Sequence, residues 1–129
     1  MADWKAFRPE HTPHPFALSL SSDEWVLLSG LGGHDPETGE ISDDVATQTR
    51  VALTTLNALL EQAGSSAAEI VYFRPYVTAR EHALTMDGVI REMLPDPKPA
   101  AGALVICELA DPRMKVEFEC WAQRGARIV

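Results

Sequence analysis

The clearest pattern of apolar residues in the chain runs from residue 45 to residue 63. Its members recur every three or four residues, which is the spacing of one face of an α-helix; they are Val45, Ala52, Leu56, Leu59 and Ala63. Residues that can cap a helix N-terminus come immediately before it, namely Ser42, Asp43 and Asp44. Gly64 follows, in the position where glycine commonly ends a helix. The pattern predicts a helix with one face built to lie on a sheet.

Shorter apolar segments before this helix predict a β-hairpin. They are residues 16–20 and 25–28, and the polar residues 21–24 between them supply the turn. Residues 1–15 are polar and contain three prolines, Pro9, Pro13 and Pro15. We therefore expect an irregular lead-in before the hairpin.

The middle of the chain predicts a strand, a second helix and a connection. Residues 70–77 alternate as a strand does, which places Arg74 on the same face as two tyrosines, Tyr72 and Tyr76. Pro75 has no N–H to donate, so it indicates an edge strand or a bulge. A less regular helix is expected over 78–93, followed by a proline-rich connection over 94–102.

Residues 103–109 and 114–121 are interpreted as a closing hairpin that turns near Asp111. In that hairpin Cys107 and Cys120 stand about three residue pairs apart, or roughly 10 Å along the strands. This separation is too large for a disulfide bond. Both cysteines are expected to be reduced, buried and structural.

The predicted order is β-β-α-β-α-β-β, an α+β domain spanning residues 1–129 in which two helices pack on one face of a sheet. Val116, Phe118 and Cys120 form an apolar face suited to those helices. Trp121 lies on the other face, and the strand before it is apolar on both sides. Two helices cannot cover both faces, so we expect a second copy of the chain to cover the other face in a closed homo-oligomer.

Charge and composition exclude several classes of protein. The 129 residues carry a net charge of −8, which disfavours binding to nucleic acid and to anionic membrane surfaces. No apolar run approaches the ~20 residues of a membrane span, and the N-terminus lacks the features of a signal peptide, so a cytoplasmic protein is expected. The histidines (His11, His14, His34 and His82) and cysteines show no metal-ligand spacing, so no metal site is expected.

Several short segments together resemble the Rid family (YjgF/YER057c/UK114-like proteins). They are Ser29-Gly30, Pro36-Glu37-Thr38-Gly39-Glu40, Gln48-Thr49, Leu60-Glu61-Gln62-Ala63-Gly64, and Val116-Glu117-Phe118-Glu119 with Ala122. No single segment is specific, but their order and spacing are. The similarity runs from about residue 15 to residue 122. It implies a chorismate-mutase-like fold, a barrel-like homotrimer and three small-molecule clefts between subunits.

The best-known members of this family hydrolyse reactive enamines and imines, such as 2-aminoacrylate, without a metal or an organic cofactor. The resemblance carries over Glu119 as the cleft glutamate. It places Ala101 where those deaminases have an arginine that grips the substrate carboxylate, and Phe16 where they have a tyrosine. The family's cleft cysteine aligns with Ala103, and its asparagine on the second helix with Asp87. A standard 2-aminoacrylate deaminase is therefore not expected.

Four residues carry the proposed chemistry. If another subunit covers Glu119, loss of water raises the pKa of its carboxyl, which then serves as a general acid or base. Alternatively, Glu119 is an interface glutamate held by backbone N–H groups. Glu117 is interpreted as structural. Arg74 supplies an anion-binding fork or a surface ion pair. Ser29 and Gly30 orient a ligand through their backbone, or form a bulge and turn.

Two functional hypotheses remain open at this stage. In the first, the chain is a cofactor-independent enzyme that acts on the C=N bond of an imine, an enamine or a related reactive intermediate. In the second, it is a ligand-binding or regulatory trimer that has lost the chemistry, as the residues at positions 16, 101 and 103 suggest.

Overall fold

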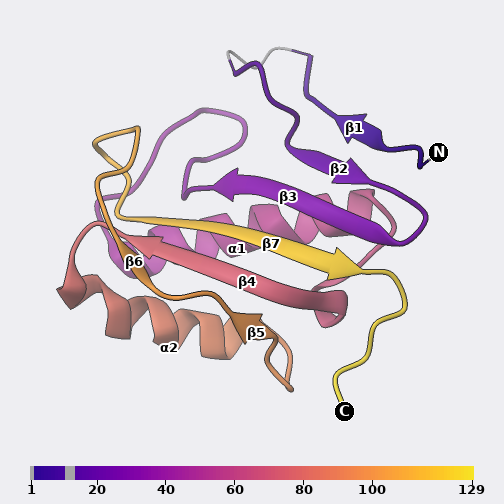
Figure 1. The fold of residues 1–129 in the computed structure, drawn as a ribbon. Helices are drawn as coiled ribbons and strands as arrows, with labels where there is room; N and C mark the ends of the chain where they lie inside the picture. Colours follow the sequence, from indigo (N-terminus) through magenta and orange to yellow (C-terminus); the bar gives the residue numbers. More distant parts are fainter. Residues whose placement is uncertain (1, 11–13) are drawn as a thin grey trace.

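A single sheet of seven strands organises the computed structural model, which describes residues 2–10 and 14–129. The strand order is β1-β2-β3-β7-β4-β5, and β6 also pairs with β4. Neighbours from β1 to β4 are antiparallel, whereas β5 and β6 run parallel to β4 (Figure 1). The bounds are β1 Lys5–Phe7, β2 Ser19–Ser21, β3 Trp25–Leu31, β4 Ile70–Val77, β5 Ala100–Ala101, β6 Val105–Ile106 and β7 Val116–Gln123.

Helix α1 (Val45–Gln62) confirms the helix predicted from the apolar pattern. Asp44 caps it, because its carboxylate accepts a hydrogen bond of 2.9 Å from the Thr47 N–H. Gly64 follows with φ of +79°, a conformation that glycine adopts without a steric penalty. In the part of the chain that the structure describes, no helix is both long and apolar enough to cross a membrane.

Helix α2 (Ala83–Met93) starts later than the second helix predicted from the sequence. A 3-10 turn at Arg80–His82 precedes it, and another, Ala67–Glu69, leads into β4. Figure 1 shows α1 behind β3 and β7, and α2 packs beside α1 against the same face.

The core lies between the helices and this face of the sheet. Val116, Phe118 and Cys120 are fully buried, as the alternation along β7 predicted. The Phe118 ring stacks on that of Phe73 in β4, with centroids 5.2 Å apart. Apolar residues of α1 complete the core from the helix side, among them Leu53, Leu56 and Leu60.

The predicted closing hairpin is wrong. β6 pairs in parallel with β4, at Tyr76 with Val105 and at Val77 with Ile106, and β4 lies between β6 and β7. The two edges of β7 are occupied by β3 and β4, so no edge is left for β6. The hairpin geometry from which the distance between the two cysteines was predicted therefore does not apply. Both cysteines are nevertheless free; Cys107 is half-buried and Cys120 is buried.

Pro75 was expected to mark an edge or a bulge, and this expectation is also wrong. β4 has neighbouring strands on both sides, so it is not an edge strand. The register of its pairing with β7 shifts between Ile70 and Tyr72, not at Pro75. On its other side, β4 pairs with β5 at residues 72–73 and with β6 at residues 76–77. Pro75 falls between these two short ladders, where no N–H is required.

The lead-in is more regular than predicted, because Lys5–Phe7 forms strand β1 on the edge of β2. The hairpin of β2 and β3 is confirmed. His11 and Pro13 lie outside the described residues.

The two cysteines should differ sharply in reactivity. Burial raises the pKa of the Cys120 thiol to about 12, so it has almost no thiolate at neutral pH. We expect a colourimetric disulfide reagent to label one thiol per native chain, Cys107, and both thiols in denaturant. Cys107→Ser should remove the native reaction. Rapid labelling of two thiols in the folded protein would contradict the placement of Cys120.

Candidate functional site

The face of β3, β7 and β4 that points away from the helices is here called the open face. No helix of the described chain lies on it, and its side chains are half-buried or exposed. Trp121 is 50% exposed there and lies 5.6 Å, between ring centroids, from Tyr72. Charged residues of β7 and β4 stand beside these aromatic rings.

Glu119 and Arg74 face each other across β7 and β4. They are directly opposite in register, and Arg74 Nε lies 3.8 Å from Glu119 Oε1. Tyr76 donates a hydrogen bond of 2.6 Å to the same carboxylate oxygen, which raises the pKa of the phenol. Arg74 Nη2 donates to the Tyr72 hydroxyl at 2.7 Å. The structure thus brings together Arg74, its two tyrosine neighbours and Glu119.

Glu117 is the more enclosed carboxyl of the open face. It lies over Gly30, where an added Cβ would come within 2.5 Å of Glu117 Oε1. Burial raises the pKa of Glu117, the charge of Glu119 raises it further, and His34 opposes the shift. The sequence analysis treated Glu117 as structural; the geometry makes it a carboxyl that holds its proton at higher pH than an ordinary glutamate.

Gly102 is a contributor that the sequence analysis did not single out. A Cβ there would meet the Tyr72 hydroxyl and would lie 2.9 Å from Arg74 Nε. The absence of a side chain allows Tyr72 and Arg74 to lie against the backbone that follows β5. No local sequence signal identifies this role, because it depends on the parallel pairing of β5 with β4.

Asp87 and Ala101 lie on the helix side of β4, away from the open face. Ala101 pairs with Phe73, whose ring is buried under the helices. With Asp87 of α2 they line a cavity of about 400 Å³, floored by apolar side chains such as Pro75 and Ile90. Within one chain the structure therefore separates these two predicted ligand-binding residues from Glu119.

Phe16 and Ser29 occupy a third location, near β2. Phe16 is 74% exposed. The Ser29 hydroxyl donates to the Ala17 carbonyl at 2.7 Å, and the Ser29 N–H donates to the Leu18 carbonyl at 2.9 Å. Ser29 thus ties β3 to the segment before β2, whereas Gly30 of the predicted Ser-Gly pair lies beneath the carboxyl of Glu117.

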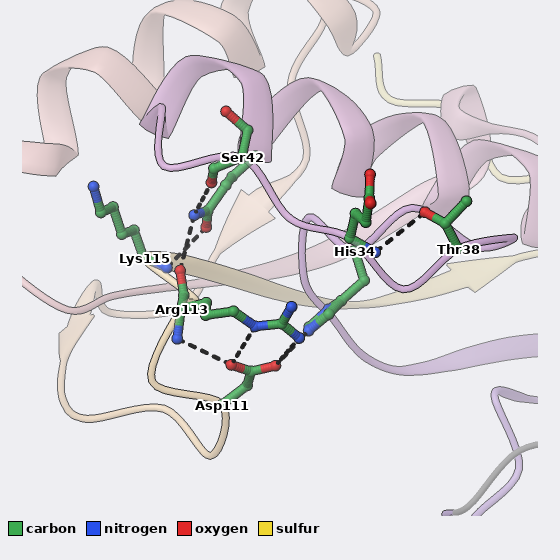
Figure 2. A network of polar contacts seen from close by, with 8 residues as sticks. His34, Thr38, Ser42, Asp111, Arg113 and Lys115 are labelled. Carbon is green, nitrogen blue, oxygen red and sulfur yellow. Dashed lines mark hydrogen bonds and ion pairs between the residues drawn. The ribbon is translucent and has the colours of Figure 1, made fainter.

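A polar network joins the loop after β3 to the loop before β7 (Figure 2). His34 Nε2 lies 3.0 Å from Asp111 Oδ2, and Arg113 Nη2 donates to the same oxygen at 2.7 Å. Hydrogen bonds from Arg113 and then from His34 hold the pKa of Asp111 well below its usual range. Sequence reasoning missed this pairing, since 77 residues separate His34 from Asp111.

Gln48 joins the loops that carry this network to α1. Its side-chain amide donates to the carbonyls of Ser42, at 2.7 Å, and Arg113, at 3.0 Å. Its carbonyl oxygen accepts from the Lys115 N–H at 2.8 Å. Gln48 is fully buried, so α1 fixes both loops. Among the described residues, no three His, Cys, Asp or Glu side chains are grouped to hold a metal ion.

The fold is that of a known class of protein. A family profile described as Endoribonuclease L-PSP matches residues 8–124, so the chain belongs to that family, Ribonuc_L-PSP. Relatives and solved structures place it with the Rid and YjgF proteins, which confirms the resemblance seen in the sequence.

Individual relatives cover most of the chain. Protein mmf2 of Schizosaccharomyces pombe, a mitochondrial protein, is 34% identical over 110 residues, which are 84% of this chain and 86% of the relative. Reactive Intermediate Deaminase A of Arabidopsis thaliana, a chloroplast protein, is 27% identical over 109 residues, which are 84% of this chain and 58% of the relative. RidA from an Antarctic Psychrobacter has the same fold, with a TM-score of 0.85, 23% identity, and coverage of 92% of this chain and 98% of that one.

Proposed function

We propose that this chain is a cofactor-independent enzyme that hydrolyses the C=N bond of an imine, or of the imine tautomer of an enamine. The observation that carries the proposal is a pair of carboxyls on the open face, Glu117 and Glu119, held in different environments. Glu117 is enclosed, whereas Glu119 contacts Arg74 and the Tyr76 hydroxyl. Two carboxyls in contrasting surroundings take different acid–base roles.

In this scheme Glu117 supplies the proton that the imine nitrogen needs. A carboxyl with a raised pKa remains protonated closer to neutral pH, and so transfers a proton more readily in that range. Glu119 keeps Arg74 and Tyr76 in place rather than reacting itself. This assignment exchanges the roles that the sequence suggested for the two glutamates.

Arg74 would recognise an anionic group on the substrate. The Arg74 side chain is 39% exposed, and its guanidinium lies over the Tyr72 ring, 5.8 Å from the centroid, so it remains available to a ligand. Ala101 cannot make that contact, and it lies on the other side of β4. The anionic group of the substrate would therefore bind at Arg74 and not at position 101, where the resemblance places the carboxylate-binding arginine of 2-aminoacrylate deaminases. An imine hydrolase of this kind does not need an arginine at position 101.

Replacing Arg74 with glutamine should separate substrates by charge. Hydrogen bonds to charged groups contribute about 1.5–3 kcal/mol, so KM for anionic imines should rise roughly 10- to 100-fold, while KM for neutral imines stays within about threefold. Steady-state kinetics on matched anionic and neutral imines would measure this. Arg80→Gln, in the exposed 3-10 turn before α2, is the matched control. An equal change for both substrates would contradict anion recognition by Arg74.

We propose that the active form is a cytoplasmic homotrimer in which another subunit covers the open face. Large apolar residues remain exposed on the single chain, including Trp121, Leu104 and Ile106 at 50%, 42% and 46%. Their burial would remove water from Glu117 and Glu119 as well. A folded monomer at micromolar concentration in light scattering would sink this part of the proposal.

Cleavage of RNA, which the family description names, is a weaker candidate for this chain. A net charge of −8 opposes the phosphate contacts that dominate nucleic-acid affinity. The open face also presents two carboxyl groups against one arginine. A small anionic substrate fits that balance better than a polyanion does.

The deciding experiment measures ammonia release from a panel of imines generated in situ by an amino-acid oxidase. The wild type should exceed the buffer rate at least tenfold for some imine, and the double variant Glu117→Gln/Glu119→Gln should not. Equal rates in wild type, double variant and buffer would remove the enzyme proposal. A ligand that raises Tm without turnover would then favour the non-catalytic trimer, which the alanine at position 101 also suits.

A further inference from the structure

We propose that His34, held in place by Asp111, is a second catalytic residue of the open face and activates the attacking water opposite Glu117. The inference rests on the proposed hydrolysis. Its starting point is a pair of glycines, Gly30 and Gly32, on either side of the buried Leu31. Gly30 lies in β3, and Gly32 directly follows Leu31, the last residue of that strand.

A proton-carrying group lies near each of these glycines. A Cβ on Gly30 would come within 2.5 Å of Glu117 Oε1. A Cβ on Gly32 would meet Met114 Cε at 2.5 Å and would lie 3.2 Å from His34 Nδ1. Residues two apart on a strand are separated by roughly 7 Å. The carboxyl and the imidazole thus lie near two backbone positions about that far apart, at the end of β3, with the Met114 side chain beside the second. His34 also acts electrostatically on Glu117, as expected for neighbours.

The tautomer of His34 follows from its contact with Asp111. The carboxylate of Asp111 is ionised, since Arg113 and His34 hold its pKa low, and an ionised carboxylate only accepts hydrogen bonds. His34 Nε2 must therefore donate to it, across 3.0 Å. The lone pair of the neutral ring is then on Nδ1, the nitrogen beside Gly32. Figure 2 shows Arg113 meeting the same carboxylate, which fixes its orientation.

A spacing of about 7 Å suits hydrolysis by direct attack of water. Paired carboxyl groups that activate a water in inverting glycosidases stand roughly 6.5–9.5 Å apart, which leaves room for the water and the reacting carbon. Here the acid is Glu117 and the base is His34. Histidine is the side chain that takes up and releases protons most readily near neutral pH.

The proposed steps balance. Water attacks the carbon of the C=N bond while His34 Nδ1 takes one of its protons; the π electrons move to nitrogen, which takes the proton of Glu117. The resulting carbinolamine collapses as the hydroxyl oxygen forms C=O and gives its proton to the Glu117 carboxylate. The C–N bond breaks with its electrons on nitrogen, which takes the proton from His34 and leaves as ammonia. Both residues return to their starting states.

Kinetics on the same imine panel test the assignment. His34→Gln should lower kcat about 10²-fold or more, with Tm nearly unchanged. It should also flatten the rise of kcat/KM between about pH 5 and 8 that titration of a histidine base produces. His82→Gln, at the start of α2, is the matched control and should behave as wild type. Retention of wild-type activity and pH profile in His34→Gln would overturn the inference.

The two proposals fail in distinguishable ways. If Glu117→Gln loses activity and His34→Gln does not, the role of His34 is wrong and the proposed hydrolysis stands. If the wild type hydrolyses no imine, both are wrong.

Discussion

Replacing Gln48 with leucine is expected to lower the free energy of unfolding by about 3–5 kcal/mol. The side chain is fully buried and serves three backbone groups, the carbonyls of Ser42 and Arg113 and the N–H of Lys115. Leucine has a similar volume but no hydrogen-bonding atoms. Each backbone group left without a partner away from water costs about 1–3 kcal/mol.

Urea denaturation, with wild type and variant at equal chain concentration, would measure the loss. Gln62→Leu is the matched control, because Gln62 lies exposed at the end of the same helix and should change stability by less than about 0.5 kcal/mol. A loss below about 1 kcal/mol in Gln48→Leu would mean that the loops do not depend on α1. Since one of those loops carries Asp111, the variant should also weaken the contact of Asp111 with His34.

The sequence predicted those parts of the fold that depend on local periodicity and caps. Helix α1 follows from its apolar spacing together with Asp44 and Gly64, and the inner face of β7 follows from alternation. Strand pairing was predicted less well. β6 pairs with β4 and not with β7, although β6 and β7 are neighbours in sequence. Which strand has an edge available for β6 depends on the strand order of the whole sheet, and that order has no local signal in the sequence.

The site shows the same division between local and distant information. Arg74 could be grouped with its neighbouring tyrosines from strand alternation, since they belong to one strand. The contact of His34 with Asp111 could not be predicted, because it joins two loops through pairings far apart in the chain. The contrast between Glu117 and Glu119 also has no local signal. Both occupy equivalent alternating positions in β7, and the carboxyl of Glu117 lies over Gly30 of the neighbouring strand β3.

The largest functional effect is expected from Glu117→Gln, which should lower kcat for imine hydrolysis about 10²- to 10⁴-fold, with KM little changed. Glutamine keeps the shape of the side chain over Gly30 but cannot donate the proton that the imine nitrogen needs. Glu119→Gln is the matched control, from the same strand and face. It should alter kcat by no more than about tenfold, because Glu119 acts by holding Arg74 and Tyr76.

The same variant has a signature in stability that needs no substrate. The folded pKa of Glu117 is raised, chiefly by burial, so its protonated form favours the folded state. That contribution is fully present below the ordinary glutamate pKa of about 4.3 and is lost as the pH rises through the raised folded value. Glutamine does not titrate, so Glu117→Gln should gain stability relative to wild type over that rise, as measured by Tm against pH. If Glu119→Gln instead abolished turnover while Glu117→Gln remained active and showed no such gain, the proton donor would be Glu119, as the sequence alone suggested.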